Sequence, residues 1–196
     1  MGEPAVSVRA GRRTVDGLPI PAPGVLVVDP AHSSIEAIVR HLVIAKVKGR
    51  FLSFSGLVHV AEDPMQSWAE VTIDAASIDT GEPQRDEHLR SADFLDVKRY
   101  PTIDFKTTFL SKTGRGKFQA GGDLTMRGQT HPVSVDCEYK GLATDPRGNE
   151  RLILTAESEF DRTRWGVNWN QALEAGGVVV SAEVQVRADI QAVRQA

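Results

Sequence analysis

The C-terminal segment from Val178 to Ala192 alternates between apolar and polar residues with almost no interruption. Every even position carries Val, Ile or Ala, and the odd positions are polar or charged except for Val179. Successive side chains of a β-strand point to opposite faces, so this period of two gives one apolar face and one hydrated face. A strand of this length predicts a sheet that curls around an apolar interior.

The same alternation recurs along most of the chain. In residues 102–109, for example, Ile103, Phe105, Thr107 and Phe109 are expected on one face. Residues 85–91 lack this period and predict a short helix. Strands are expected at residues 25–28, 35–41, 49–60, 68–75, 102–109, 117–126, 133–141, 151–161 and 178–192. The expected count is about eight strands, most of them joined by short polar turns.

Sequential strands with short connections predict an all-β protein, folded as an eight-stranded antiparallel up-and-down barrel with short helical insertions. Closure of the barrel removes the exposed edges that long strands would otherwise offer to other chains. We expect one barrel domain at residues 25–196. Residues 1–24 are rich in Gly, Pro and Arg and predict a flexible N-terminal arm.

The pattern leaves the content of the barrel open. A barrel of eight strands is just wide enough to be filled by its own side chains or to hold one small ligand. Small residues such as Ala120, Ala156 and Ala188 on the expected inner faces leave room. Phe105 and Phe118 are large enough to fill that room as an ordinary packed core.

Composition excludes several classes of protein. The hydrophobic fraction of 41% and the charged fraction of 25% are typical of a globular domain, and the net charge of −3 argues against a non-specific nucleic-acid binder. No apolar run approaches the ~18 residues of a membrane-spanning helix, and no secretory signal core follows Arg13. The cytoplasm is therefore the expected compartment. The single cysteine, Cys137, is interpreted as a small buried hydrophobe.

Particular motifs add to this pattern, and from about residue 25 to residue 192 they resemble the YceI-like family of lipid- and polyisoprenoid-binding proteins in content and order. The most specific block is Arg85–Val97, which runs into Tyr100–Phe105. The other matching motifs are Asp29–Ile35, Val39–His41, Gly49–Gly56, Ser77–Gly81, Leu124–Val133, Arg164, Trp169–Asn170 and Glu174–Val178.

The resemblance implies a lipocalin-like barrel whose lumen takes an elongated apolar molecule, such as a polyisoprenoid, an isoprenoid quinone or another lipid. It implies no enzymatic activity and no metal, and no cofactor is expected. Two positions differ from the family pattern: Ala37 and Trp165 stand where phenylalanine is common. Either difference could reshape the lumen.

The five histidines match no zinc-binding spacing, and there is no second cysteine. His41 shares a face with Val39 and is expected to point inward. Such a histidine could be an ordinary buried side chain or a polar contact for a lipid head group. We expect the ligand-binding residues at the lumen and its rim to be His32, His41, Phe51, Phe54, Arg85, His88, Phe94, Tyr100, Phe105, Trp165 and Trp169.

The helical segment allows two interpretations. Arg85 or Arg90 could hold a phosphate group through paired hydrogen bonds. Alternatively, Asp86 pairs with an arginine and fixes the insertion over the barrel, which is favoured because a loop of this length must be anchored.

Other functional hypotheses remain open at this point. One is an enzyme that acts on a lipid or quinone-like substrate at the rim, with His41 or His88 as the acid–base group. Another is an interaction module with a filled barrel. Apolar residues at Val179 and Ile153, expected on the outer face, leave a homodimer open. The expected partner is a small lipid or isoprenoid and not a nucleic acid.

Overall fold

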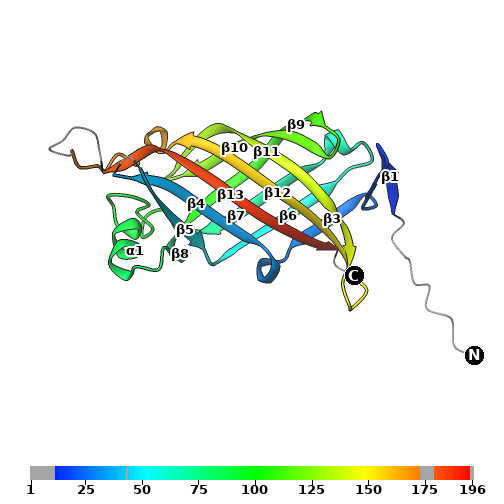
Figure 1. Ribbon diagram of the computed structural model, residues 1–196, viewed down its shortest axis with the longest axis horizontal. Coiled ribbons are helices and arrows are strands. Elements are labelled where there is room, and N and C mark those ends of the chain that lie inside the picture. Colours follow the sequence, from blue (N-terminus) through cyan, green and yellow to red (C-terminus); the bar gives the residue numbers. More distant parts are fainter. Residues whose placement is uncertain (1–11, 43, 173–178, 195–196) are drawn as a thin grey trace, which may run out of the picture.

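The computed structural model describes residues 12–42, 44–172 and 179–194. Its long strands wrap around a common axis, with the helix α1 (Pro83–Arg90) at one end and the hairpin strand β1 at the other (Figure 1). The strands are β1 Arg13–Val15, β2 Leu18–Ile20, β3 Gly24–Val28, β4 Ser34–His41, β5 Ala45–Phe51, β6 Phe54–Val60, β7 Trp68–Asp74, β8 Ile78–Asp79, β9 Thr102–Gly114, β10 Lys117–Met126, β11 Gln129–Thr144, β12 Glu150–Asp161 and β13 Val180–Arg194. Short 3₁₀ turns cover Pro30–His32, Pro64–Gln66, Ala75–Ser77 and Arg162–Trp165.

The sheet closes on itself as an eight-stranded antiparallel barrel. The ring runs β12, β11, β10, β9, β7, β6, β3 and β13, and β13 pairs back with β12. β3 and β4 pair with successive parts of β13, so they act as one strand broken by the turn at Pro30–His32. In the same way, β5 pairs with β4 and β6 pairs with β3, so β5 and β6 act as one interrupted strand. The prediction of an up-and-down barrel is confirmed.

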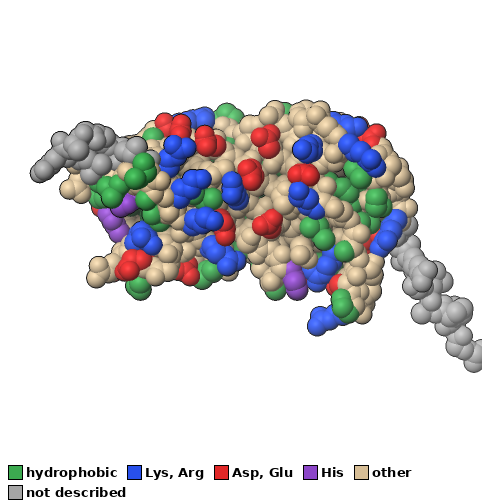
Figure 2. Space-filling view, viewed as in Figure 1, with side chains coloured by type: hydrophobic (Ala, Val, Ile, Leu, Met, Phe, Trp, Pro, Cys, Tyr) green, Lys and Arg blue, Asp and Glu red, His purple; other side chains and the backbone are tan. Residues whose placement is uncertain are grey.

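The predicted inner faces are confirmed in β10 and β12, and in β13 from Val184 to Ile190. The register shifts between Val180 and Val184, so Ala182 is exposed and Val179, expected on the outer face, lines the cavity instead. Leu154 and Ala156 of β12 face the barrel interior, and Ala156 lies opposite Ala188 of β13. The outer wall carries intermixed acidic and basic side chains across these strands, as Figure 2 shows. A one-residue slip of any strand would exchange the two faces, so the apolar pattern also fixes the register.

The prediction that Phe109 shares the inner face with Phe105 is wrong. A bulge in β9 places Thr107 opposite Gly122 but Phe109 opposite Gly121, so Thr108 is an extra residue. The extra residue reverses the facing of the rest of the strand. As a result Phe109 is 57% exposed, and Leu110 replaces it on the inner face.

The predicted helix is present as α1, which begins with Pro83 after the N-cap residue Glu82. The buried Asp86 accepts hydrogen bonds from the backbone N–H and the hydroxyl of Thr80, at 2.9 and 2.5 Å. The prediction that Asp86 pairs with an arginine is therefore wrong, although Asp86 does tie the helix to the barrel. Arg90 adds hydrogen bonds to the carbonyls of Ala76 and Ile78.

Residues 13–20 form a β-hairpin, which differs from the flexible arm expected there; residues 1–11 lie outside the described residues. Asp16 and Gly17 occupy its turn with φ values of 53° and 72°. Two consecutive positive φ angles are typical of the type I′ turn that the Asp-Gly pair favours. The boundary at residue 25 itself remains a prediction. Within the described part of the chain, no helix has the length and apolar character needed to cross a bilayer.

Candidate ligand-binding cavity

The barrel encloses a cavity of about 1000 Å³. Its wall is the apolar inner face of the strands, with Val71, Leu124, Leu154 and Val186 among the lining residues. Sites for small molecules commonly span ~300–1,000 Å³, so this volume lies at the upper end of that range. Of the two interpretations left open by the sequence, the structure shows the hollow barrel.

Several of the side chains that line the cavity are small and leave room in the lumen. Ala37, Ala120, Ala156 and Ala188 all line the cavity. Ala37 is one of the two positions that depart from the family pattern, and a phenylalanine there would project into this space. Trp165, the other departure, does not line the cavity.

The structure brings most of the predicted ligand-binding residues to the cavity wall. Those that line it are His41, Phe51, Arg85, His88, Phe94, Phe105 and Trp169. Those that do not are His32, Phe54, Tyr100 and Trp165. Ligand contact by any of these residues remains a prediction.

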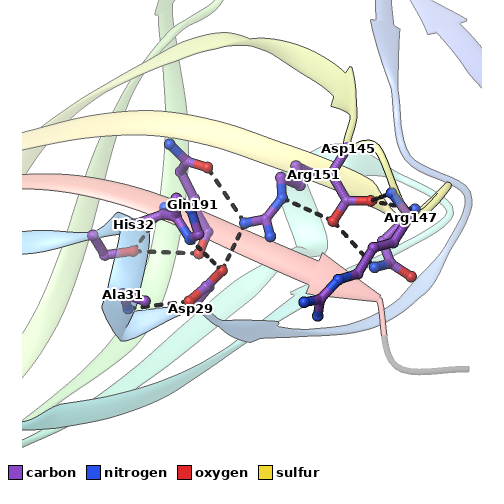
Figure 3. Close-up of polar contacts among 9 residues, drawn as sticks. Asp29, Ala31, His32, Asp145, Arg147, Arg151 and Gln191 are labelled. Atoms are coloured by element: carbon purple, nitrogen blue, oxygen red, sulfur yellow. Dashed lines mark hydrogen bonds and ion pairs between the residues drawn. The ribbon is translucent and has the colours of Figure 1, made fainter.

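His32 lies on the outside of the barrel, and its side chain is 57% exposed. Its Nδ1 is 2.8 Å from Oδ2 of Asp29, which in turn accepts a 2.7 Å hydrogen bond from Arg151 (Figure 3). Arg151 also contacts Asp145 at 3.2 Å. Figure 3 shows this chain of contacts joining the turn after β3 to the start of β12 and the loop before it. His32 therefore belongs to a structural network.

The other three residues outside the lining have packing roles. Trp165 is fully buried and donates from Nε1 to the carbonyl of Leu124 at 2.9 Å. Phe54, the first residue of β6, is buried in the hydrophobic core. The ring of Tyr100 lies so close to Gly128 that a Cβ there would be 2.8 Å from its Cε1.

An aromatic and polar cluster lies at the α1 end of the cavity. His88 Nε2 is 2.9 Å from Oδ2 of Asp93. The His88 ring packs edge to face against two aromatic rings here. Its centroid lies 5.0 Å from that of Phe94 and 4.8 Å from that of Trp169. Aromatic rings beside polar groups suit an apolar ligand that has a polar end.

Two arginines add positive charge at this end. Arg85 is exposed and donates to the hydroxyl and the carbonyl of Thr80, at 2.7 and 3.1 Å. Arg162, which the sequence interpretation missed, is only 4% exposed and lines the cavity. It donates to the carbonyls of Ser181, Val167 and Trp169.

Burial lowers the pKa of the Arg162 guanidinium, and the nearby Asp161 carboxylate works in the opposite direction. Burying a charge is costly unless it is well hydrogen-bonded, and here backbone carbonyls supply that bonding. No local pattern in the sequence marks this arginine, because it simply follows the polar end of β12.

The opposite end of the cavity is lined partly by the N-terminal hairpin, through Val15, Leu18 and Ile20. The sequence interpretation missed these residues, although the Asp16-Gly17 pair is a hairpin signal that could have found them. Tyr139 and Cys137 also line this region. Burial raises the pKa of Cys137 to about 11 and that of Tyr139 to about 12. A thiol with such a pKa is mostly protonated at neutral pH, so it behaves as the small hydrophobe expected.

Among residues 12–42, 44–172 and 179–194, no group of three or more His, Cys, Asp or Glu side chains is arranged to hold a metal ion. The matching motif at Glu174–Val178 lies wholly outside these ranges.

Comparisons with known sequences agree with this architecture. A family model described as the YceI-like domain matches residues 26–192. A UPF0312 protein of Staphylococcus aureus is 35% identical over 162 residues, which cover 82% of this chain and 92% of that protein. A UPF0312 protein of Vibrio cholerae is 36% identical over 140 residues, covering 70% and 73%.

Solved structures share the fold. BcnA of Burkholderia cenocepacia superposes with a TM-score of 0.71 at 24% identity, covering 84% of this chain and 98% of that one. A polyisoprenoid binding domain from Saccharophagus degradans gives a TM-score of 0.68 at 14% identity, covering 88% and 99%. The barrel, the matched residues and the curated relatives lead to one conclusion: this chain belongs to the YceI-like family.

Proposed function

We propose that this protein binds an elongated apolar molecule, such as a polyisoprenoid, an isoprenoid quinone or another lipid, in the barrel lumen. The observation that carries the proposal is the continuous cavity of about 1000 Å³, walled by the apolar faces of the strands. The structural similarity to a domain described as polyisoprenoid binding supports this ligand class. The protein would carry or sequester the molecule without changing it.

The two ends of the cavity differ, and this difference suggests how the ligand is oriented. The α1 end offers Arg85, His88 and Arg162, which can donate hydrogen bonds to an oxygen-bearing head group. The rest of the lumen offers mainly apolar contacts for the tail. Burying roughly 400 Å² of apolar ligand surface would gain on the order of 10 kcal/mol before ordering costs.

The proposal is tested by blocking the lumen with one substitution. Ala188→Phe adds a ring on the inner face, whereas Asp189→Phe adds the same ring at the exposed neighbouring position of β13. Binding of geranylgeraniol is measured by intrinsic tryptophan fluorescence, since Trp68 and Trp169 line the cavity. We expect at least tenfold weaker binding for Ala188→Phe and unchanged binding for Asp189→Phe. Equal binding by both variants would place the ligand outside the lumen.

One observation favours a second candidate function. The contact between His88 and Asp93 orients an imidazole at the cavity wall, an arrangement that general acid–base catalysis uses. The alternative is therefore an enzyme acting on a lipid or quinone-like substrate at the rim. Incubation of wild type and His88→Ala with ubiquinone and polyprenyl ester probes tests it. Product formed by wild type and lost in a folded His88→Ala variant would favour the enzyme.

Three further expectations stay predictions. A cytoplasmic location is tested by cell fractionation, and the absence of nucleic-acid binding by a gel-shift assay. A homodimer is tested by light scattering of wild type and Ile153→Ser, since Ile153 is the apolar position expected on the outer face that does not line the cavity.

A further inference from the structure

The N-terminal hairpin lies outside residues 26–192, the part that matches the family model, yet it forms part of the cavity wall. Val15, Leu18 and Ile20 line the cavity, while the alternate residues Thr14 and Pro19 are exposed. The hairpin lies at the end of the barrel opposite α1 (Figure 1). Its apolar side therefore faces along the lumen toward the polar cluster at the other end.

Side chains from several barrel segments fasten the hairpin in place. Arg13 donates to the carbonyls of Ala61 and Glu62, in the turn after β6. The Tyr139 hydroxyl of β11 donates to the carbonyl of Pro19. On a third side, Lys112 of β9 pairs with Asp16 at the hairpin turn.

Close packing adds to these polar contacts. Pro21, directly after the hairpin, is fully buried, and a Cβ at Gly116 would lie 3.2 Å from Cδ1 of Leu18. The charged groups that line this end are already engaged. Asp16 pairs with Lys112, and Asp63 accepts a 3.0 Å hydrogen bond from the backbone of Met65. What this end offers a ligand is thus mainly the apolar side chains of the hairpin.

We propose that the hairpin is the floor of the lumen and that Leu18 and Ile20 set the maximum length of the apolar tail that fits. This inference rests on the proposed function. It assigns the ligand class more narrowly: an amphiphile with one polar head, at the α1 end, and one tail of limited length that ends against the hairpin. A second polar group at the tail end would lose its hydration against these apolar side chains.

The test uses the full-length protein and a series of isoprenoid alcohols of increasing length: farnesol, geranylgeraniol and solanesol. Native mass spectrometry of competition mixtures gives the ratio of long to short alcohol bound. Leu18→Ala deepens the lumen, and we expect the ratio to rise roughly tenfold, as for a hydrophobic pocket that gains room. Leu18→Trp makes the lumen shallower and should lower the ratio. Thr14→Ala, on the exposed side of the same hairpin, should leave the ratio unchanged.

The outcomes separate the two proposals. Binding of the alcohols with the same length preference in wild type, Leu18→Ala and Leu18→Trp would overturn the role of the hairpin and leave the ligand-binding function standing. Binding of none of the alcohols by wild type would overturn both. Because Leu18→Ala and Leu18→Trp shift the ratio in opposite directions, a folding defect in one, detected by thermal melting, leaves the other to decide.

Discussion

Phe105 occupies the space that a side chain on Gly122 would need. A Cβ at Gly122 would lie 2.3 Å from Cε2 of Phe105 and 2.8 Å from the carbonyl oxygen of Lys106. The missing side chain allows the Phe105 ring to rest against the neighbouring strand of the barrel wall. Phe105 lines the cavity, so this contact helps to keep a large ring from filling the lumen.

Gly122→Ala should therefore weaken ligand binding, because the new methyl group pushes the Phe105 ring into the lumen. Overpacking of this kind costs about 1–3 kcal/mol of stability. Geranylgeraniol titration and urea unfolding measure the two effects. In the double variant Gly122→Ala/Phe105→Leu, binding should recover more than stability, since the clash with the Lys106 carbonyl remains. If Gly122→Ala binds geranylgeraniol as well as wild type does, the position of the Phe105 ring does not limit the space in the lumen.

The two tryptophans near the α1 end should respond differently to substitution. Trp165→Phe removes the hydrogen bond to the buried Leu124 carbonyl and should cost about 1–3 kcal/mol of stability, with ligand affinity nearly unchanged. Trp169→Leu should weaken binding at a smaller cost in stability, because Trp169 lines the cavity and is only half-buried. Urea unfolding and ligand titration of both variants check this contrast. The opposite pattern would move the binding site away from Trp169.

Acid stability should depend on Arg151. Its hydrogen bond lowers the pKa of Asp29, and the backbone N–H of Asn149, together with Arg151, lowers the pKa of Asp145. A depressed folded-state pKa contributes stability above the ordinary carboxyl value of 3.8, and that stability is lost as the pH falls through the folded-state value. Arg151→Met should thus destabilise the protein at pH 7, with a smaller difference from wild type in strong acid.

Urea unfolding at a series of pH values measures this dependence. Arg187→Met is the matched control, since Arg187 pairs with Glu157 on the exposed outer wall, where both side chains are about half exposed. Exposed pairs contribute little to stability. A difference between wild type and Arg151→Met that stays constant down to the lowest pH would show that the carboxylates are not responsible.

Cys137 should report whether the lumen is occupied. Its pKa of about 11 leaves little thiolate at pH 8, so the native thiol should react slowly with a disulfide reagent and rapidly in urea. Because Cys137 lines the cavity, a saturating isoprenoid should slow the native reaction further. Reaction rates with and without geranylgeraniol measure the effect. Unchanged rates at saturation would mean that the ligand does not reach Cys137.

The alternating residues were sufficient to predict the barrel, because each strand has only one register that buries its apolar face. The apolar alternate residues of β10 and β12 face inward, as the sequence pattern indicates. In β9 the same reasoning fails after Thr107, since an extra residue in a bulge leaves no mark in an apolar–polar pattern. The hairpin at residues 13–20 was missed because strands of three residues are too short to show a period.

The site was partly predictable for a similar reason. His41 and Phe105 lie on alternating strands, so their inward direction follows from their neighbours. His32 and Trp165 lie in 3₁₀ turns, where side-chain direction depends on tertiary contacts such as those to Asp29 and Leu124. Arg162 was missed because its burial depends on three carbonyls brought together by the fold.

Native mass spectrometry of the protein after exposure to a total lipid extract shows whether the lumen holds a guest molecule. We expect a complex one apolar molecule heavier than the bare chain, formed equally by wild type and Asp189→Phe and strongly reduced in Ala188→Phe. Spectra showing only the bare chain for wild type, or the complex in equal amounts for all three proteins, would contradict binding in the lumen.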